Sequence, residues 1–202
     1  MKQHVYLLAI VAASLAFSSL STGCVSVAAR EARTSSSVIG VRQYDKEWFD
    51  AAREGRWDIL EALVDAKFPI NATTPQGYTA LILAAYNNHP DTVDKLLASG
   101  ASACVGDRNG NTALMGALFK GYADVARKLM HTKCDINQTN NAGETALAFA
   151  ALFGRFDLLP ELVKDGADPN HLDSRGNSAL QNVLAQGNHA AARALRAVGA
   201  NY

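Results

Sequence analysis

One short motif returns four times in this chain at a constant interval. It reads GYTALIL from Gly77, GNTALMG from Gly110, GETALAF from Gly143 and GNSALQN from Gly176, so each copy begins 33 residues after the previous one. A repeat of this length predicts a row of equal units, because one such unit is too small to bury its apolar face without its neighbours. We therefore expect a stack of repeats rather than a single globular core.

Residues that recur at the same place in each unit predict two short helices per unit. Thr79 precedes an apolar run and is a typical N-cap residue, and Asn88 stands in a column of glycines, where a helix ends with positive φ. Val93, Leu96 and Leu97 then follow the i, i+3, i+4 spacing of a helix that buries one face. The most regular column is Leu63, Leu96, Leu129, Leu162 and Leu195. We expect helices near 79–87 and 90–98 and at 33-residue offsets from them, without extended β-strands.

The period and these columns resemble the ankyrin repeat, a unit of 33 residues with the signature T-P-L-H-x-A. The resemblance extends from Tyr44 to Tyr202 and implies an all-α fold, an ankyrin repeat solenoid of about five stacked helix-turn-helix units. The units are 44–76, 77–109, 110–142, 143–175 and 176–202. The signature itself differs, since TALI, TALM, TALA and SALQ replace its proline by alanine and lack its histidine. The hydrogen bonds which that histidine makes in the family are therefore missing here.

Three places depart from a regular array. Pro160 lies beyond the first turn of the fourth unit's second helix, so we expect that helix to be irregular. Trp48 and Trp57 in the first unit are expected to cover the first inter-repeat face. The last unit has a polar outer face, as a terminal repeat needs. Its polar residues are Gln181, Asn182, Gln186, Asn188 and Arg196.

The first residues differ in composition from the repeats. A positive start, MKQH, an apolar run, VYLLAIVAASLAF, and small residues after it predict a secretory signal peptide at residues 1–23, followed by a flexible linker at 24–43. Two processing routes stay open. The stretch LSTGC resembles a bacterial lipoprotein signal, although its leucine lies one place too far back, and would lead to lipidation of Cys24 and an outer-membrane anchor. The other route is cleavage after Ala29, and either route predicts a periplasmic location.

Charge and motifs argue against nucleic-acid binding and catalysis. Lys and Arg together number 19, as do Asp and Glu, so the formal net charge is zero and nothing attracts the whole chain to nucleic acid. The sequence has no phosphate-binding loop, no H-E-x-x-H and no glycine-flanked nucleophilic serine. His131 and Cys134 form a lone H-x-x-C, which lacks the further ligands of a zinc site. We therefore expect no enzyme activity, no cofactor and no metal.

Two cysteines and two asparagines have alternative interpretations. Cys104 and Cys134 lie in adjacent units, three columns apart, and form a disulfide only if their Cα atoms come within about 7 Å. The spacing of neighbouring units favours two small buried thiols, whereas export to an oxidising compartment favours the bond. Asn71 and Asn137 begin glycosylation motifs but share one repeat column, which favours a structural role.

Positions that vary between units indicate where a partner would bind. In ankyrin proteins the concave groove is formed by the turn tips and by the residues that follow the paired alanines of the first helix. On that basis we predict a protein-binding surface with an apolar row across the second to fourth units. Its residues are Tyr78, Tyr86, Asn87, Asp107, Arg108, Asn111, Phe119, Lys120, Glu144, Leu152 and Phe153. The alternative is that some of these rings turn inward and fill gaps left by small alanines.

The resemblance implies a non-catalytic, monomeric module that binds another protein. Exported bacterial ankyrin proteins are associated with catalase function, which favours a scaffold or helper of a periplasmic enzyme. Others in bacteria neutralise toxins, so the alternative is an immunity or inhibitor protein against a toxin that acts in the periplasm. We expect no nucleic-acid partner, and contact with a membrane only through a lipid on Cys24.

Overall fold

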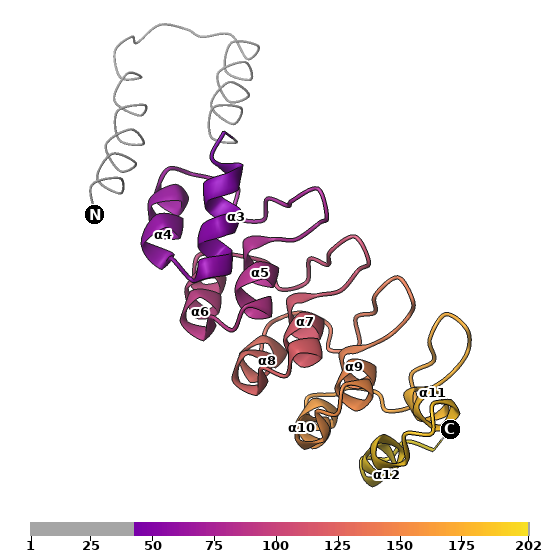
Figure 1. Cartoon of the computed structure of the whole chain (residues 1–202). Coiled ribbons are helices and arrows are strands. Elements are labelled where there is room, and N and C mark those ends of the chain that lie inside the picture. Colours follow the sequence, from indigo (N-terminus) through magenta and orange to yellow (C-terminus); the bar gives the residue numbers. More distant parts are fainter. Residues whose placement is uncertain (1–42, 202) are drawn as a thin grey trace, which may run out of the picture.

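The computed structural model describes residues 43–201, in which the chain forms a row of helix pairs (Figure 1). The first helices of the pairs are α3 (Asp45–Glu54), α5 (Ala80–Tyr86), α7 (Ala113–Lys120), α9 (Ala146–Leu152) and α11 (Ala179–Ala185). The second helices are α4 (Trp57–Asp65), α6 (Pro90–Ala98), α8 (Ala123–Met130), α10 (Leu159–Lys164) and α12 (His189–Ala197). The predicted signal peptide, almost all of the linker and the lipidation site at Cys24 lie outside the described residues.

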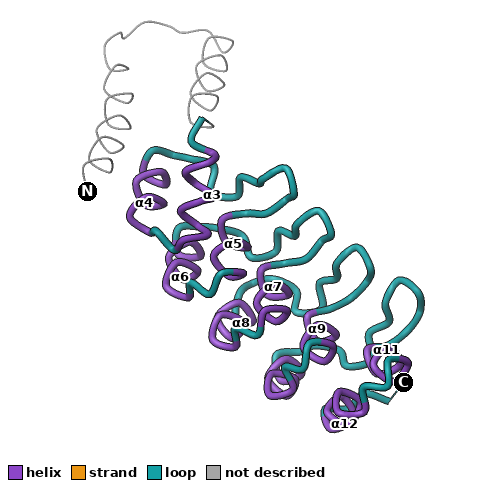
Figure 2. Tube along the Cα trace, viewed as in Figure 1, coloured by secondary structure: helices purple, strands orange, loops and turns teal. Residues whose placement is uncertain are grey.

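The helix pairs stack in one direction, and long loops project from the row of first helices (Figure 2). Neighbouring first helices contact one another from α3 to α11, and each packs on the second helix that follows it. Within residues 43–201 the β pairing amounts to two isolated bridges, Thr73 with Thr79 and Leu172 with Ser178. The prediction of an all-α repeat solenoid is confirmed.

Each first helix from α5 onward begins at the predicted cap. The hydroxyl of Thr79 accepts a hydrogen bond from the backbone N–H of Ile82, three residues ahead, and so satisfies a donor that the helix cannot pair internally. The equivalent caps of α7, α9 and α11 are Thr112, Thr145 and Ser178. At Ser178 the side-chain Oε1 of Gln181 in turn accepts a hydrogen bond from the backbone N–H of Ser178, which completes a capping box.

The core runs along the whole row between the two helix layers. The leucine column predicted from the period is at most 2 % exposed in every unit. Ala84, Ala85, Ala150 and Ala151 are fully buried where the first helices meet, because a methyl group lets the helices approach closely. At the N-terminal end Trp48 is fully buried and its ring stacks on Phe68 with centroids 4.8 Å apart. This indole is therefore part of the first unit's own core, and Trp57 is half-buried.

The fourth unit's second helix is interrupted, as Pro160 predicts. Phe156–Leu158 form the short 3-10 helix η1, and the α-helix α10 begins only at Leu159. Pro160 then lies in the first turn of α10, where a missing backbone N–H leaves no intrahelical bond unmade.

The loops form a second row, held together by backbone hydrogen bonds from each turn tip to the preceding one. Arg108 N donates to Gln76 O at 3.0 Å, and Asn141 N donates to Asn109 O at 2.8 Å. Gly77 adjoins the first of these contacts, where an added Cβ would lie 2.6 Å from the backbone nitrogen of Arg108. A side chain at this position would therefore push the loops apart.

A column of asparagines just after the second helices links successive units. Asn71 Oδ1 accepts from Ser102 N, and Asn137 Oδ1 accepts from Asp168 N, both at 2.8 Å. The amide of Asn137 also donates to the carbonyl of Gly166 at 2.9 Å. The predicted structural role of Asn71 and Asn137 is therefore confirmed.

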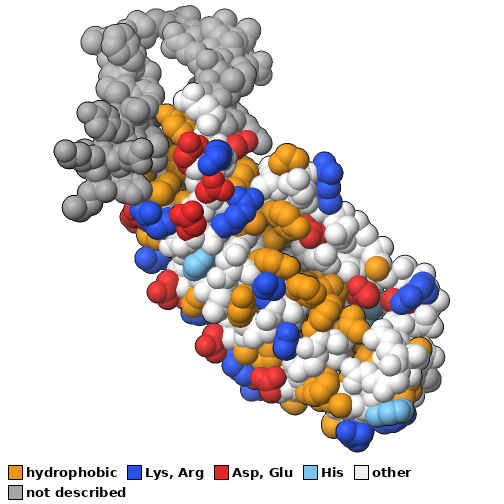
Figure 3. All heavy atoms as spheres, in the orientation of Figure 1, with side chains coloured by type: hydrophobic (Ala, Val, Ile, Leu, Met, Phe, Trp, Pro, Cys, Tyr) orange, Lys and Arg blue, Asp and Glu red, His pale blue; other side chains and the backbone are white. Residues whose placement is uncertain are grey.

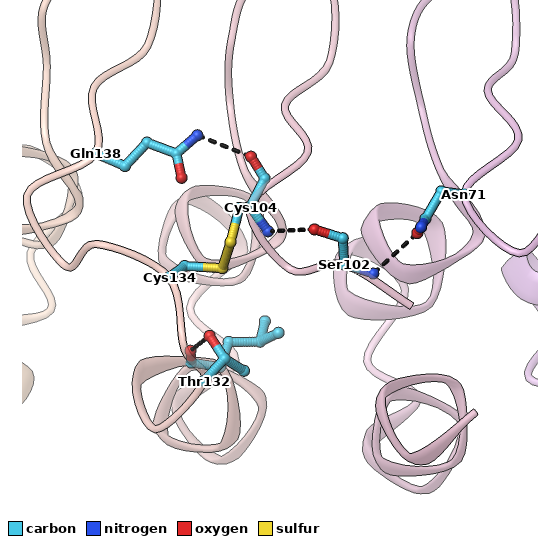
Figure 4. The surroundings of a disulfide bond; sticks show 7 residues. Asn71, Ser102, Cys104, Thr132, Cys134 and Gln138 are labelled. Atoms are coloured by element: carbon cyan, nitrogen blue, oxygen red, sulfur yellow. Dashed lines mark hydrogen bonds between the residues drawn. A yellow bond between two sulfur atoms is a disulfide. The ribbon is translucent and has the colours of Figure 1, made fainter. Parts of the chain in front are cut away.

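The expectation of two buried thiols is wrong, because Cys104 and Cys134 form a disulfide with Cα atoms 5.3 Å apart (Figure 4). Cys104 is exposed and occupies the asparagine column, whose members already reach the next unit. Lys133 stands where the neighbouring units have Gly100 and Gly166. The disulfide thus links two units at the one described junction that lacks the asparagine.

Candidate functional site

Four aromatic side chains from three consecutive units form a continuous cluster on the first-helix side. Tyr86 and Phe119 stack with ring centroids 6.0 Å apart, and the edge of one ring meets the face of the other between Phe119 and Phe153, at 4.8 Å. Phe149 lies 5.6 Å from Phe153. We call these four residues the aromatic row. Tyr86 is 38 % and Phe119 42 % exposed, so the two rings do not turn inward to fill the core.

The aromatic row borders a hollow of about 300 Å³ between the first helices and the turn tips. Its lining residues are Tyr78, Ile82, Tyr86, Asp107, Asn109, Asn111, Thr112, Met115, Gly116, Phe119, Phe149 and Phe153. Hydrophobic side chains gather over the middle of the face seen in Figure 3. A second hollow of about 300 Å³, which includes Arg53 and Asn87, shares Tyr78, Ile82 and Tyr86 with the first. The two hollows together form a groove across the first four units.

The structure brings six of the eleven predicted residues together around the first hollow: Tyr78, Tyr86, Asp107, Asn111, Phe119 and Phe153. Asn87 lines the adjoining hollow, and its amide donates to Leu83 O at 2.8 Å. Arg108 is exposed at its turn tip, Glu144 accepts a bond from Asn140, and Leu152 is half-buried. Those three residues and Lys120 do not line either hollow.

Asp107 belongs first to its own turn. Its Oδ1 accepts from the backbone N–H groups of Asn109 at 2.8 Å and Asn111 at 2.9 Å. Thr74, one repeat earlier, accepts from two backbone N–H groups in the same way. Oδ1 of Asp107 therefore stabilises the turn tip. Oδ2 has only a 3.5 Å contact with the Asn111 amide, so it is the more available of the two oxygens for a partner.

Asp173 holds the same column in the last complete loop and is buried. Burial raises its pKa, but the N–H groups of Asn177 and Arg175 and the side chains of Asn182 and Arg175 lower it more, so the pKa lies well below the usual aspartate range. Its four-fold set of donors makes Asp173 a structural residue.

Two cations flank Phe119. Lys120 Nζ lies 4.8 Å from the centroid of the Tyr86 ring, a cation–π contact. Arg155 donates to the carbonyls of Leu118 at 3.0 Å and Phe119 at 3.1 Å, at the end of α7. Among the described residues neither cation is within ion-pair distance of a carboxylate. Asp50, near the other end of the groove, is already paired with Lys46 and Arg53, and the hydrogen bond from Lys46 lowers the Asp50 pKa.

Six residues that line the first hollow are absent from the predicted set: Ile82, Asn109, Thr112, Met115, Gly116 and Phe149. Ile82 and Met115 hold the column in which the signature has histidine, and Phe149 lies in the column of Leu83 and Gly116. A glycine inside a helical segment is an anomaly that was visible in the sequence and points to this place.

The aromatic, apolar and amide side chains at the groove are of the kinds that contact another protein's surface. Within residues 43–201 no group of three or more His, Cys, Asp or Glu is arranged to hold a metal ion, and Cys134 is consumed by the disulfide. Over the same residues no helix has the length and apolar character needed to cross a bilayer.

Comparison with known families agrees with the repeat geometry. A family model for ankyrin repeats (3 copies) matches residues 48–140, and a second for ankyrin repeats (many copies) matches residues 129–181. The chain belongs to the ankyrin repeat family. Ankyrin repeats indicate a protein–protein interaction module. No curated protein matches the chain.

Proposed function

We propose that this ankyrin protein is an exported, non-catalytic module that binds a protein partner through the groove bordered by the aromatic row. The observation that carries the proposal is the exposure of Tyr86 and Phe119 beside a hollow of about 300 Å³. Exposed aromatic clusters mark interaction sites, because a partner that covers them removes apolar surface from water. The groove needs little rearrangement before binding, since its walls belong to packed helices and hydrogen-bonded turns.

Export to the bacterial periplasm is part of the proposal. The signal-peptide pattern of residues 1–23 supports it, and so does the disulfide between Cys104 and Cys134, because such bonds persist mainly in oxidising compartments. There the protein serves as a scaffold or helper of a resident enzyme. An immunity role against a toxin would use the same surface, and the identity of the captured partner separates the two.

Phe119→Ala tests the groove directly. We expect the variant to keep a near-wild-type melting temperature, because the ring is 42 % exposed, and to lose proteins that the wild-type chain retains from periplasmic extract. Leu129→Ala is the control for core damage, with an expected loss of about 2–5 kcal/mol of unfolding free energy. The proposal fails if Phe119→Ala melts as early as Leu129→Ala, or if it retains the same proteins as the wild type.

A further inference from the structure

Gly116 is a glycine that the fold does not require. It lies inside α7 with a helical backbone, and a Cβ built there would meet only the Cδ2 atom of Tyr86, at an ordinary contact distance of 3.5 Å. Glycine inside a helix is destabilising by roughly 0.5–1 kcal/mol relative to alanine. The same column holds Leu83 and Phe149 in the neighbouring units, so larger side chains fit this place in the stack.

The missing side chain keeps the hollow open. Gly116 and Met115 lie on its α7 side, and the rings of Tyr86, Phe119 and Phe149 border it. Its volume of about 300 Å³ is at the lower limit for small-molecule pockets and is ample for one bulky side chain of a partner.

The charges around the hollow determine which residues of the partner can lie next to that bulky side chain. The face of Tyr86 is already occupied by Lys120 Nζ at 4.8 Å, so a second cation entering the hollow would be repelled. Lys120 and Arg155 have no carboxylate partner among the described residues. On the loop side Asp107 also lines the hollow, and its Oδ1 is held by two backbone N–H groups of its own turn. Its Oδ2 would repel an acidic group near the turn, so a carboxylate of the partner is favoured only at the α7 end, beside Lys120.

We propose that the groove recognises an acidic–apolar segment of a partner protein, with a bulky apolar side chain in the Gly116 hollow and an adjacent carboxylate paired with Lys120. This inference rests on the proposed function and specifies the partner's chemistry. Gly116 then sets specificity because its lack of a side chain leaves room for the partner's apolar residue. Lys120 sets the charge that the partner must present.

The test is selection of a phage-displayed library of short random peptides on the full chain, followed by affinity measurements on synthetic consensus peptides. We expect the selected peptides to share a bulky apolar residue next to Asp or Glu. Gly116→Leu should fill the hollow and weaken binding at least about ten-fold while the melting temperature stays the same or rises. Lys120→Glu should weaken binding of the acidic peptide and select basic residues in its place.

Lys95→Glu is the matched control, because Lys95 also lies over an aromatic ring, Trp57, at 5.6 Å, but its helix α6 is in the second layer. It should leave peptide binding unchanged. A basic or uncharged consensus, or full binding of the peptides by Gly116→Leu, overturns the inference. If binding of those peptides still requires Phe119, the proposed function of the groove is retained. If no selected peptide depends on Phe119, the proposed function fails as well.

Discussion

Asn88 has a positive φ of 60° in a column where the other described units have glycine. It ends α5 in the left-handed region, which asparagine tolerates better than most residues with a side chain. The preference for glycine in this column thus comes from a backbone angle, and asparagine meets the requirement at a modest cost.

Asn88→Ala should lower the unfolding free energy by about 1 kcal/mol, because alanine lacks the short polar side chain that makes the left-handed region accessible. For a chain of this size that corresponds to a fall of about 2–4 °C in melting temperature. Thermal unfolding followed by circular dichroism measures it. Asn88→Gly is the matched control and should melt at or above the wild-type temperature.

Asp173 predicts a pH dependence. Its folded-state pKa lies below the unfolded value, so the folded chain binds fewer protons and the carboxylate stabilises the fold above the unfolded pKa of about 4. That stabilisation is lost as the pH falls from about 5 toward the depressed folded pKa. Chemical unfolding at a series of pH values should show a shallower acid loss for Asp173→Asn than for the wild type. Equal slopes for the two proteins would contradict this role.

The turn after α8 differs from the other turns between units. In the turns after α6, α10 and α12 an asparagine of the preceding unit bonds to the turn, and a glycine at positive φ accepts the bond or adjoins it, as Asn137 and Gly166 show. Here Lys133 replaces the glycine, Cys104 replaces the asparagine, and the disulfide with Cys134 makes the connection. Gln138 adds a hydrogen bond to the carbonyl of Cys104 at 2.8 Å.

Breaking the disulfide should therefore loosen one junction in the middle of the stack. Cys104→Ser with Cys134→Ser should cost about 3–4 kcal/mol in the chain-entropy estimate for a loop of this length. Urea unfolding with and without dithiothreitol measures the loss for the wild type. Cys104→Asn with Lys133→Gly and Cys134→Ala restores the column pattern and should recover part of the stability. No recovery over the serine variant would show that the asparagine column contributes little.

The units stack through three parallel sets of contacts: buried leucines and alanines, backbone bonds between turn tips, and the asparagine column with its one disulfide. Outer helices add ion pairs between units, such as Arg127 with Glu161 and Lys128 with Asp94. Because every unit contacts only its neighbours, a groove spread over several units keeps its shape as long as these junctions hold.

Anchoring of the whole molecule can be tested at Cys24. If LSTGC is the processed site, Cys24→Ala should move the protein from the membrane pellet to the soluble periplasm, since the lipid would be its attachment. Immunoblotting of fractionated cells measures this. A mature N-terminus at Arg30 by mass spectrometry would instead demonstrate cleavage after Ala29.

The repeat, the helix pairs, the caps and the break before Pro160 could all be predicted from the sequence, because each depends on residues only a few positions apart. The helix pairs recur in every unit and the caps from the second unit onward, whereas the break belongs to the fourth unit alone. The sequence also placed Tyr86 and Phe119 on one surface, since residues in one column point the same way. The contacts between columns could not be predicted in this way, namely the Cα separation of Cys104 and Cys134 and the hollow beside Gly116. Both features depend on the translation and rotation that relate one unit to the next. That relation is set by packing across the whole interface between units, so no single column of residues encodes it.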